Sequence, residues 1–536
     1  MNTLALMMAA GAVAFGLAKR FRLPVIPLLL IIGTSLSLAG IHPAEETLTT
    51  TLQLGLAFLV FVAGTELNPN RFKSRRKSVL WVAAGQFAGA GFGGYLVARW
   101  FGWGPQEALY LACATAASST VVALRQLKKS GQLLEPFGRL VLGVLLVQDL
   151  AMIVLILVLS RSDEGYRAVG QSLLALVLLA GLAWFCQQKI MPRLLARKTM
   201  DEEVLLLTVL AVLFAFLSLA RTLGMGDLTI LTGAFLAGFA LSDFPVSGIT
   251  RSALTAVADF FMAVFFISLG VMVQIPNWST LWQALAFAGI VLVVTPPLVT
   301  LLAEWQGLTS RAATESGLLL AQTSELSLVL GLSGLLQQHI SSETFSVIAL
   351  VTVITMTWTP FLATDRVTRW LLHFHPVRRR LKTDKSPVGH VLVLGFGSGG
   401  MWVIKPLLAA GHKVLVVDDD PMVMHTLERQ RILCLRGDGS DEKILDQAGA
   451  NRARVVIVSM RRAAEAQKVL KHVKNAPVIV RVFEEVDAQM IERFGGIPIL
   501  NSHAAADTFM EWFDKSPAMR QVEKQTEPVS GIQEAV

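Results

Sequence analysis

The chain has 536 residues, of which 53% are hydrophobic and only 16% are charged, against about 25% charged in an ordinary soluble domain. This composition excludes a wholly soluble protein, and the length leaves room for several domains. The net charge of +8 does not indicate nucleic-acid binding, because most cations of the apolar part lie in short loops, where orientation in a membrane explains them. The three cysteines, Cys113, Cys186 and Cys434, are too scattered for a disulfide framework or a metal site.

The first two thirds of the chain consist of apolar segments, each about long enough to cross a bilayer. The first is expected to be a retained helix, because its basic residues follow the apolar stretch, the reverse of a signal peptide. The ninth is short, so twelve crossings remain an alternative to thirteen. The predicted spans are 3–18, 23–40, 48–66, 78–98, 106–124, 137–160, 168–190, 203–221, 227–241, 256–274, 281–303, 314–338 and 344–364.

Basic residues in the loops alternate along the chain. They follow the odd-numbered spans, as at Lys19, Arg20 and Arg22 or at Arg378–Arg380, whereas the intervening loops are poor in cations. Cytoplasmic loops carry the excess of Lys and Arg. The pattern therefore predicts the N-terminus outside and the C-terminal region in the cytoplasm, in the inner membrane of a bacterium.

Two of the predicted spans have polar interruptions at mid-membrane. The fifth contains Thr115, Ser118 and Ser119, and the twelfth contains Gln322, Ser324 and Glu325. Small and hydroxyl residues can satisfy the backbone where a helix unwinds, although ordinary helix packing is the alternative explanation for either one. The two spans are seven apart, so they run in opposite directions. Interrupted helices at corresponding places of inverted repeats indicate a transporter site.

Asp149 lies near the middle of the sixth span and is preceded by Gln148. An ionised carboxylate at that depth is costly, and such residues usually handle ions or protons. A carboxylate that binds either a proton or a monovalent cation provides the minimal chemistry of an antiporter. Neutralisation by a buried partner is the alternative. Glu325 has three open interpretations: a ligand, a neutral hydrogen-bonding acid, or a tie between helices.

The C-terminal region begins with the pattern of a nucleotide-binding fold. The apolar stretch 390–394 is followed by Gly395, Phe396, Gly397, Ser398 and Gly400, then by a helix-like stretch and a second strand that ends in Asp418 and Asp419. This order is a strong dinucleotide signal, with the glycines near a pyrophosphate and Asp418 near a ribose. A fold that has lost its ligand is the alternative. The later pair Gly437 and Asp438 follows another strand.

Several segments together carry a family resemblance. The chain resembles Kef-type potassium/proton antiporters of the cation:proton antiporter-2 family, followed by a TrkA-N domain. The matching segments are Gly64–Leu67, Ala117–Thr120, Gly143–Leu150, Gly233–Gly238, Phe265–Ile267, Gln322–Glu325 and the step at Gly437–Asp438. The resemblance implies two crossed discontinuous helices beside Asp149, which carries the ion, with Gln148 as its companion. It favours K+ over Na+.

The resemblance also implies the organisation of the whole chain. It predicts a helical sodium/proton-antiporter-like exchange domain at 1–370, a basic linker at 371–387, a Rossmann-like TrkA-N domain at 388–515 and a disordered polar tail at 516–536. NAD(H) or an adenine nucleotide such as AMP or ATP is the expected regulatory ligand. The expected partners are lipid, a second copy bound through both domains, and a cytoplasmic ancillary subunit.

Three departures from the family bear on mechanism. The eleventh span has Val293–Pro297 where many relatives carry a lysine, which puts a lysine-dependent step in doubt. Ser398 stands where an arginine is common, and the tail is short, so glutathione control is not expected.

Two other function classes compete with an antiporter. A ligand-gated potassium channel would need a carbonyl filter sequence, and a membrane oxidoreductase would need a second redox centre. Neither motif occurs in the sequence, so we expect a transporter and no enzyme.

Overall fold

The computed structural model describes residues 2–21, 23–41, 45–65, 76–130, 132–133, 136–195, 202–223, 229–242, 248–274, 276–308, 310–372, 388–396, 401–418, 421–430, 432–460 and 463–500. The chain divides into two compact units. The first comprises Met1–Gln306 and Ser310–His375, and the second comprises Gly307–Thr309 and Pro376–Val536. Predictions on 373–387, on Gly397, Ser398, Gly400 and Asp419, and on the tail lie outside the described residues.

The first unit is helical throughout its described residues. Its helices are α1 (Asn2–Phe21), α2 (Val25–Leu38), α3 (Glu45–Thr65), α4 (Arg76–Trp100), α5 (Pro105–Ala116), α6 (Thr120–Lys129), α7 (Pro136–Ser160), α8 (Tyr166–Phe185), α9 (Met191–Leu195), α10 (Glu202–Thr222), α11 (Thr229–Leu241), α12 (Gly248–Met272), α13 (Trp278–Gly289), α14 (Thr295–Trp305), α15 (Ser310–Leu319), α16 (Glu325–Leu336), α17 (Ser342–Leu362) and α18 (Asp365–Leu372).

Each predicted apolar segment coincides with one helix or with two consecutive ones. The fifth is split into α5 and α6 and the twelfth into α15 and α16, whereas π-helical turns at Cys186–Ile190 and Ile290–Val294 join α8 to α9 and α13 to α14. Within the part of the chain that the structure describes, six helical segments are long and apolar enough to cross a membrane. The predicted helical class and its two interruptions are confirmed, and the number of crossings stays a prediction.

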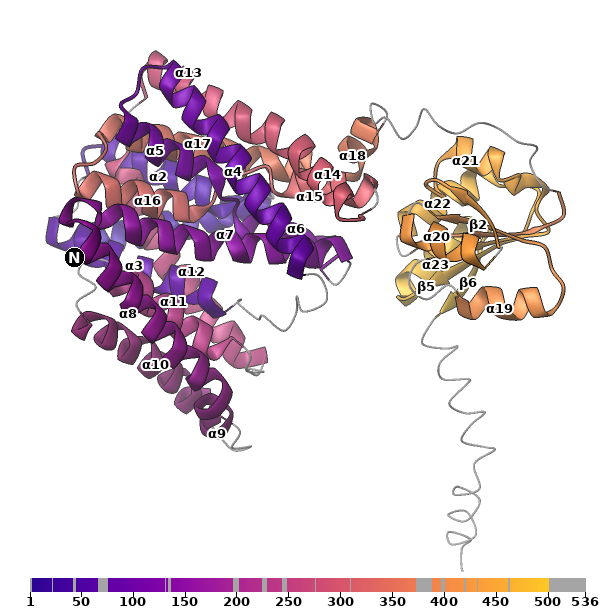
Figure 1. The fold of residues 1–536 in the computed structure, drawn as a ribbon, viewed down its shortest axis with the longest axis horizontal. Helices are drawn as coiled ribbons and strands as arrows, with labels where there is room; N and C mark the ends of the chain where they lie inside the picture. Colours follow the sequence, from indigo (N-terminus) through magenta and orange to yellow (C-terminus); the bar gives the residue numbers. More distant parts are fainter. Residues whose placement is uncertain are drawn as a thin grey trace, which may run out of the picture. The chain divides into compact units, whose positions relative to one another are not determined.

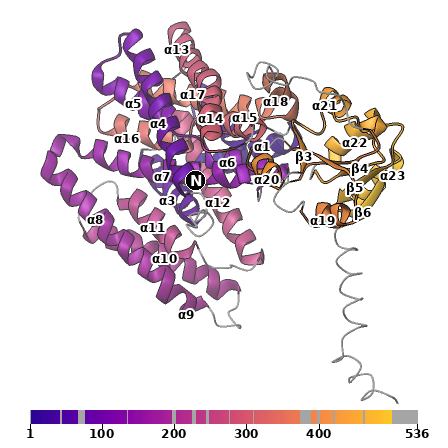
Figure 2. The same cartoon turned by 45° about the vertical axis from the view of Figure 1, so that its right-hand side comes forward.

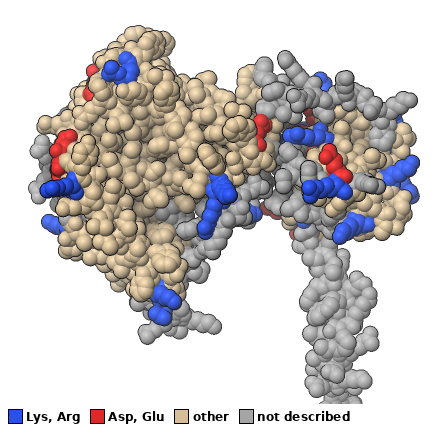
Figure 3. All heavy atoms as spheres, in the orientation of Figure 1, with Lys and Arg blue, Asp and Glu red and all other residues tan. Residues whose placement is uncertain are grey.

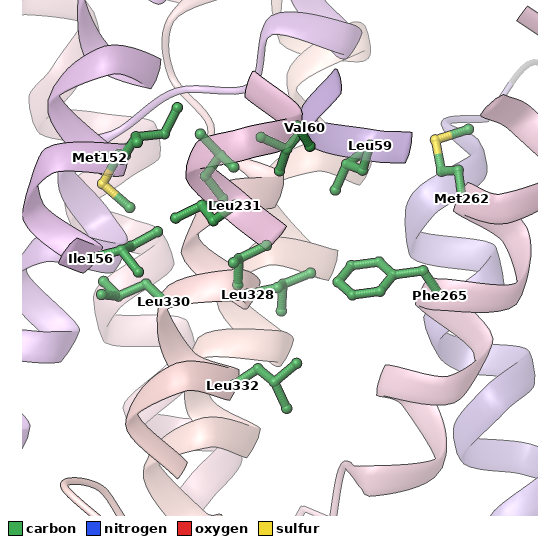
Figure 4. Close-up of a cluster of buried hydrophobic side chains, with 14 of the residues drawn as sticks. Leu59, Val60, Met152, Ile156, Leu231, Met262, Phe265, Leu328, Leu330 and Leu332 are labelled. Atoms are coloured by element: carbon green, nitrogen blue, oxygen red, sulfur yellow. The ribbon is translucent and has the colours of Figure 1, made fainter. Parts of the chain in front are cut away.

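Contacts between helices divide most of the first unit into two groups; Figure 1 shows α10 and α11 on the side away from α13 and α14. In one group α1, α2, α3, α10, α11 and α12 pack together, and in the other α4, α5, α6, α7 and α13 to α17 do. An apolar layer lies where they meet. Met152, Ile156, Leu328, Leu330 and Leu332 of α7 and α16 face side chains from α3, α11 and α12 (Figure 4). Dispersion and burial hold such a layer together without directional bonds.

Two close glycine contacts reveal an internal symmetry. A Cβ on Gly33 of α2 would lie 2.9 Å from the Gly270 Cα of α12, and one on Gly64 of α3 would lie 3.0 Å from the Gly238 Cα of α11. If the second repeat begins seven spans after the first, α2 corresponds to α11 and α3 corresponds to α12. The contact between α2 and α12 is then equivalent to the contact between α3 and α11. The predicted inverted repeats therefore appear in the packing, where small residues let backbones approach.

The face of the first unit that is shown in Figure 3 suits a lipid environment, since few charged side chains appear on its described residues. Exposed tryptophans lie at opposite ends of neighbouring helices, with Trp81 and Trp100 towards the two ends of α4, Trp278 at the start of α13 and Trp305 at the end of α14. Tryptophan is enriched at both membrane–water interfaces.

The second unit is an α/β fold around one parallel sheet (Figure 2). The strand order is β3-β2-β1-β4-β5-β6. Its elements are β1 (Val391–Leu394), α19 (Met401–Ala409), β2 (Val414–Asp418), α20 (Pro421–Arg429), β3 (Leu433–Arg436), α21 (Glu442–Gln447), β4 (Val455–Val458), α22 (Ala463–His472), β5 (Val478–Val482), α23 (Glu485–Arg493) and β6 (Ile497–Leu500).

Both faces of the central strands are covered, which explains why β1 and β2 read as continuous apolar runs. Ile404 of α19 and Leu427 of α20 pack on one face, and Leu445, Val469 and Ile491 of α21, α22 and α23 pack on the other. The predicted Rossmann-like class is confirmed.

The glycine contact between α3 and α11 gives a first prediction. A Cβ at position 238 would lie 2.1 Å from the Phe61 carbonyl oxygen, whereas one at Gly181 of α8 would meet nothing within 4 Å. We expect Gly238→Ala to lower the stability of the detergent-solubilised protein by about 1–3 kcal/mol through overpacking, with little change for Gly181→Ala. Thermal unfolding measures both, and equal midpoints would show that α3 and α11 do not depend on this contact.

A second prediction concerns His390, which lies just before β1. Its ring is buried and lies near the backbone of Ala448, which acts against the effect of burial on its pKa. Burial, with Arg452 nearby, lowers the pKa of His390 below its ordinary value of 6.5. The unfolded chain therefore binds the proton more readily, and stability falls as the pH drops below about 6.5.

We expect denaturant midpoints of the isolated second unit to fall between pH 7.5 and 5.5, and to fall less in His390→Leu. His412→Leu, a change at a half-buried site, is the matched control. The same pH dependence in His390→Leu and wild type would contradict the assignment.

Candidate functional site

The two interrupted helices break in the same manner. Helix α5 ends at Ala116 and α6 starts at Thr120, while α15 ends at Leu319 and α16 starts at Glu325. Ser119 and Ser324 precede the second halves in extended conformation, and their hydroxyls accept the N–H groups of Val122 and Leu326. Each break thus ends in an N-cap, which satisfies a donor that the helix start leaves free.

The two breaks contact each other directly. The Ser118 hydroxyl donates to the Leu320 carbonyl oxygen at 2.7 Å, and the Gln322 amide donates to the Ser119 carbonyl oxygen at 3.2 Å. The Ser327 hydroxyl of α16 reaches the Ala114 carbonyl oxygen of α5 at 2.7 Å. The structure therefore brings Ser118, Ser119 and Gln322 to one crossing point.

Neighbouring helices supply partners for the backbone groups that the breaks release. Gln86 of α4 donates to the Ala116 carbonyl oxygen at 3.1 Å, and Gln148 of α7 accepts the Ser118 N–H at 3.1 Å. At the second break, Thr355 and Thr359 of α17 contact the backbone of Thr323 and Ala321. Such partners allow irregular backbone at membrane depth.

Asp149 lies on α7 beside the first break. Its side chain is 6% exposed, and its Oδ2 accepts the Thr120 hydroxyl at 2.8 Å. Gln148 and Asp149 are adjacent in the chain and contact opposite sides of the same break, one at Ser118 and the other at the first residue of α6. The start of a helix favours a nearby negative charge, and Asp149 brings a carboxylate to the start of α6.

Glu325 is the first residue of α16 and is 6% exposed. Its carboxyl group lies beside the Ser119 hydroxyl and the Val121 backbone, at the start of α6. Its Oε2 has no hydrogen-bond partner among the described residues. Two acidic side chains, Asp149 and Glu325, therefore both contact the region where α6 begins.

Thr115 occupies a different environment from the other predicted residues. Its hydroxyl donates to the Leu111 and Ala112 carbonyl oxygens of its own helix, and its Oγ1 is 3.5 Å from the Ala90 carbonyl oxygen. Gly94 of α4 makes this close packing possible, because a Cβ there would lie 2.1 Å from the Thr115 hydroxyl oxygen. Thr115 thus packs α5 against α4.

The sequence reasoning did not single out Gln86, Thr120, Thr355 or Thr359 as site residues. Their common signal is a buried amide or hydroxyl in an otherwise apolar helix. Hydroxyl residues are frequent in membrane helices and often bond back to their own backbone, so the sequence alone did not separate these from ordinary helix residues.

The nucleotide pattern is assembled at the carboxyl edge of the sheet. Gly395 follows β1 with a φ of +77°, a conformation that favours glycine. The next backbone N–H, of Phe396, donates to Asp418 Oδ2 at the end of β2 at 2.6 Å. Asp418 is 7% exposed. The acid therefore orders the turn itself, a role that the sequence reasoning had not assigned to it.

The consecutive residues Gly437 and Asp438 lie next to Asp418. The Gly437 N–H donates to the Asp418 carbonyl oxygen at 3.0 Å, and Asp438 Oδ1 accepts the N–H and hydroxyl of Ser440 at 2.8 Å each. The strand order reverses between β1 and β4, and ligands of open parallel sheets bind outside the carboxyl ends of strands at such a point. The described residues of the motif meet there.

The architecture of the first unit defines a class of protein: a secondary transporter with crossed interrupted helices around a buried acid. Residues 4–364 match the family of transmembrane sodium/hydrogen exchangers, and residues 391–501 match the TrkA-N domain. The chain belongs to the sodium/hydrogen exchanger family and has the Kef-like architecture, a cation/proton exchanger followed by a TrkA-N domain.

A solved structure shares the fold of the first unit, and two others match the chain at lower TM-scores. The sodium proton antiporter MjNhaP1 from Methanocaldococcus jannaschii is 16% identical and aligns over 68% of this chain and 98% of its own, with a TM-score of 0.52. The TrkA-N domain of the inner membrane protein YbaL from Escherichia coli is 19% identical over 24% of this chain and 98% of its own, at 0.23. A GsuK channel bound to NAD is 18% identical over 41% of both chains, at 0.21.

Proposed function

We propose that this cation/proton exchanger is a K+/H+ antiporter in which Asp149 binds the cation and the proton in turn. The observation that carries the proposal is the buried Asp149 carboxylate beside the first break, bonded to Thr120. A carboxylate that is largely removed from water must be neutralised by one of two competing ligands. The cation and the proton therefore exclude each other at one group, which couples their fluxes.

Oxygen atoms around Asp149 can complete a monovalent cation site. Gln148 Oε1 and the Thr120 hydroxyl lie on the two sides of the break, and Ser118, Ser119 and Gln322 follow at the crossing. Thr115, Ser324 and Glu325 support the same two helices. Hard cations prefer such oxygen ligands.

The two helix groups provide the moving parts. The apolar layer between them contains aliphatic, methionine and phenylalanine side chains, which can slide past each other without breaking directional bonds. Alternating access then arises when the group that carries α5, α6, α7, α15 and α16 shifts against the other group.

The preference for K+ rests on the Gln148–Asp149 pair, which resembles that of Kef-type proteins. A Na+/H+ antiporter and a ligand-gated efflux system are the alternatives. Exchange driven by K+, Na+ and Li+ in the same vesicles separates the ions.

A nucleotide at the carboxyl edge of the second unit is the proposed regulator, either NAD(H) or an adenine nucleotide such as AMP or ATP. Gly395 and Phe396 form the ordered turn, Asp418 lies at the ribose position, and Gly437 with Asp438 borders the adenine side. Gly397, Ser398 and Gly400 would approach the pyrophosphate, with Asp419 beside the ribose. A ligand changes transport only through different affinities for two states.

The proposed cellular setting follows from the loop charges. The protein lies in a bacterial inner membrane with its N-terminus outside and the TrkA-N domain in the cytoplasm. We propose a homodimer through both domains and a cytoplasmic ancillary subunit.

The central prediction concerns Asp149. Asp149→Asn should abolish K+-driven exchange, because an amide cannot alternate between proton and cation. Glu325→Gln should retain measurable exchange, since Glu325 also serves as the start of α16. Dye-monitored dissipation of a pH gradient in vesicles measures both.

The matched control is Glu164→Gln, which neutralises an exposed carboxylate paired with Arg161. It should exchange at the wild-type rate. Wild-type exchange by correctly folded Asp149→Asn would exclude Asp149 as the carrier.

The regulatory prediction uses Asp418→Asn. Its amide oxygen can still accept the Phe396 N–H, whereas its NH₂ group cannot accept from ribose hydroxyls. We expect weaker nucleotide binding and a lost transport response with basal exchange intact. About tenfold regulation corresponds to 1.4 kcal/mol of coupling.

The control is Asp446→Asn, which changes a carboxylate that pairs with His472. This variant should bind nucleotide as the wild type does. Calorimetry with NAD+, NADH, AMP and ATP on residues 386–536 measures the binding. If none of the four binds, regulation by a nucleotide at this site is wrong.

A further inference from the structure

Helix α17 presents three fully buried threonines to the second break. The Thr323 N–H donates to the Thr355 hydroxyl oxygen at 3.2 Å, and the Thr359 hydroxyl donates to the Ala321 carbonyl oxygen at 2.7 Å. Thr352 accepts the hydroxyl of Thr323 at 3.2 Å and contacts no backbone group of the break among the described residues. Two of the three threonines therefore contact backbone groups that an uninterrupted helix would have paired by itself.

The bond between Thr323 and Thr355 has a counterpart in the first repeat. The offset of seven spans that exchanges the glycine contacts also maps α7 to α17. Gln148 and Thr355 both lie near the middle of these helices. Gln148 accepts the Ser118 N–H of the first break, and Thr355 accepts the Thr323 N–H of the second. The two acceptors perform the same task at pseudosymmetric places.

We propose that Thr355 is a positioning residue for cation/proton exchange, holding the second break as Gln148 holds the first. This role rests on the proposed site at Asp149. Thr355 does not need to touch the ion, because the second break contacts the first through Ser118 and Gln322. The first break in turn contacts Asp149 through Thr120. A displaced second break therefore changes the surroundings of Asp149.

The hydrogen-bond pattern of Thr355 argues for this role over ordinary back-bonding. Its hydroxyl can donate to the Val351 carbonyl oxygen of its own helix at 2.8 Å, as threonines in membrane helices commonly do. The lone pairs of the same oxygen remain available, and the Thr323 N–H uses one of them. Thr352 donates to Ile348 in the same way but receives no backbone N–H of the break among the described residues.

The two repeats differ at the residue that follows each acceptor. Asp149 follows Gln148, whereas Met356, which is fully buried, follows Thr355. The second repeat keeps the support for its break but has an apolar side chain in place of the carboxylate. Thr355 therefore positions the second break and does not bind the ion. Its substitution should change the affinity for the cation more than the maximal rate of exchange.

The experiment compares Thr355→Val, Thr355→Ser and Thr352→Val in full-length protein in vesicles. Valine keeps the volume but leaves the Thr323 N–H without an acceptor. We expect the K+ concentration for half-maximal exchange to rise about tenfold in Thr355→Val, with a smaller change in maximal rate. Thr355→Ser, which keeps the hydroxyl, should stay within about twofold of wild type. Thr352→Val should do the same, because it removes no backbone partner.

The possible outcomes separate this role from a general loss of stability. A wild-type half-maximal concentration in Thr355→Val, or the same shift in Thr352→Val, would overturn the proposal. If Thr355→Val does not accumulate in membranes, Thr355→Cys replaces it: an intermediate shift supports the role, and no shift overturns it. Asp149→Asn in the same assay reports on the exchange site independently, so failure at Thr355 leaves that result unaffected.

Discussion

The need to satisfy every backbone polar group away from water governs the first unit. An uninterrupted helix satisfies its backbone N–H and C=O groups by its own hydrogen bonds, but a broken helix cannot. Each backbone group without a partner inside a bilayer costs several kcal/mol. Here the partners come from Gln86, Gln148, Thr355 and Thr359 and from the opposing break. Irregular backbone with its dipoles therefore lies at the crossing, where a cation site can form.

The inverted repeats share architecture but not chemistry. Gly33–Gly270 and Gly64–Gly238 are equivalent contacts, and Ser118 and Gln322 connect the breaks in both directions. Asp149, in contrast, has Met356 at the corresponding place. The equivalent glycine contacts account for the shared scaffold of the two repeats, and the repeats differ in side-chain chemistry at Asp149 and Met356.

In the second unit one buried acid orders the turn that follows the first strand. Asp418 accepts the Phe396 N–H and so orders the turn after Gly395, whose positive φ other residues rarely adopt. A nucleotide there would bind a turn that is already formed, which lowers the entropic cost of binding.

The sequence by itself determined the fold class, the interruptions at Ser118–Ser119 and Gln322–Ser324, and the order of strands and glycines after residue 390. These depend on apolar length, period and turn chemistry, which are local. Asp149 and Gln148 also stood out, because a lone acid in an apolar span is conspicuous. Only the tertiary structure decided which side chains complete the breaks. Gln86, Thr355 and Thr359 are ordinary residues of their helices until packing places them beside Ala116, Thr323 and Ala321. The same holds for Asp418, whose bond to Phe396 depends on the pairing of β1 with β2.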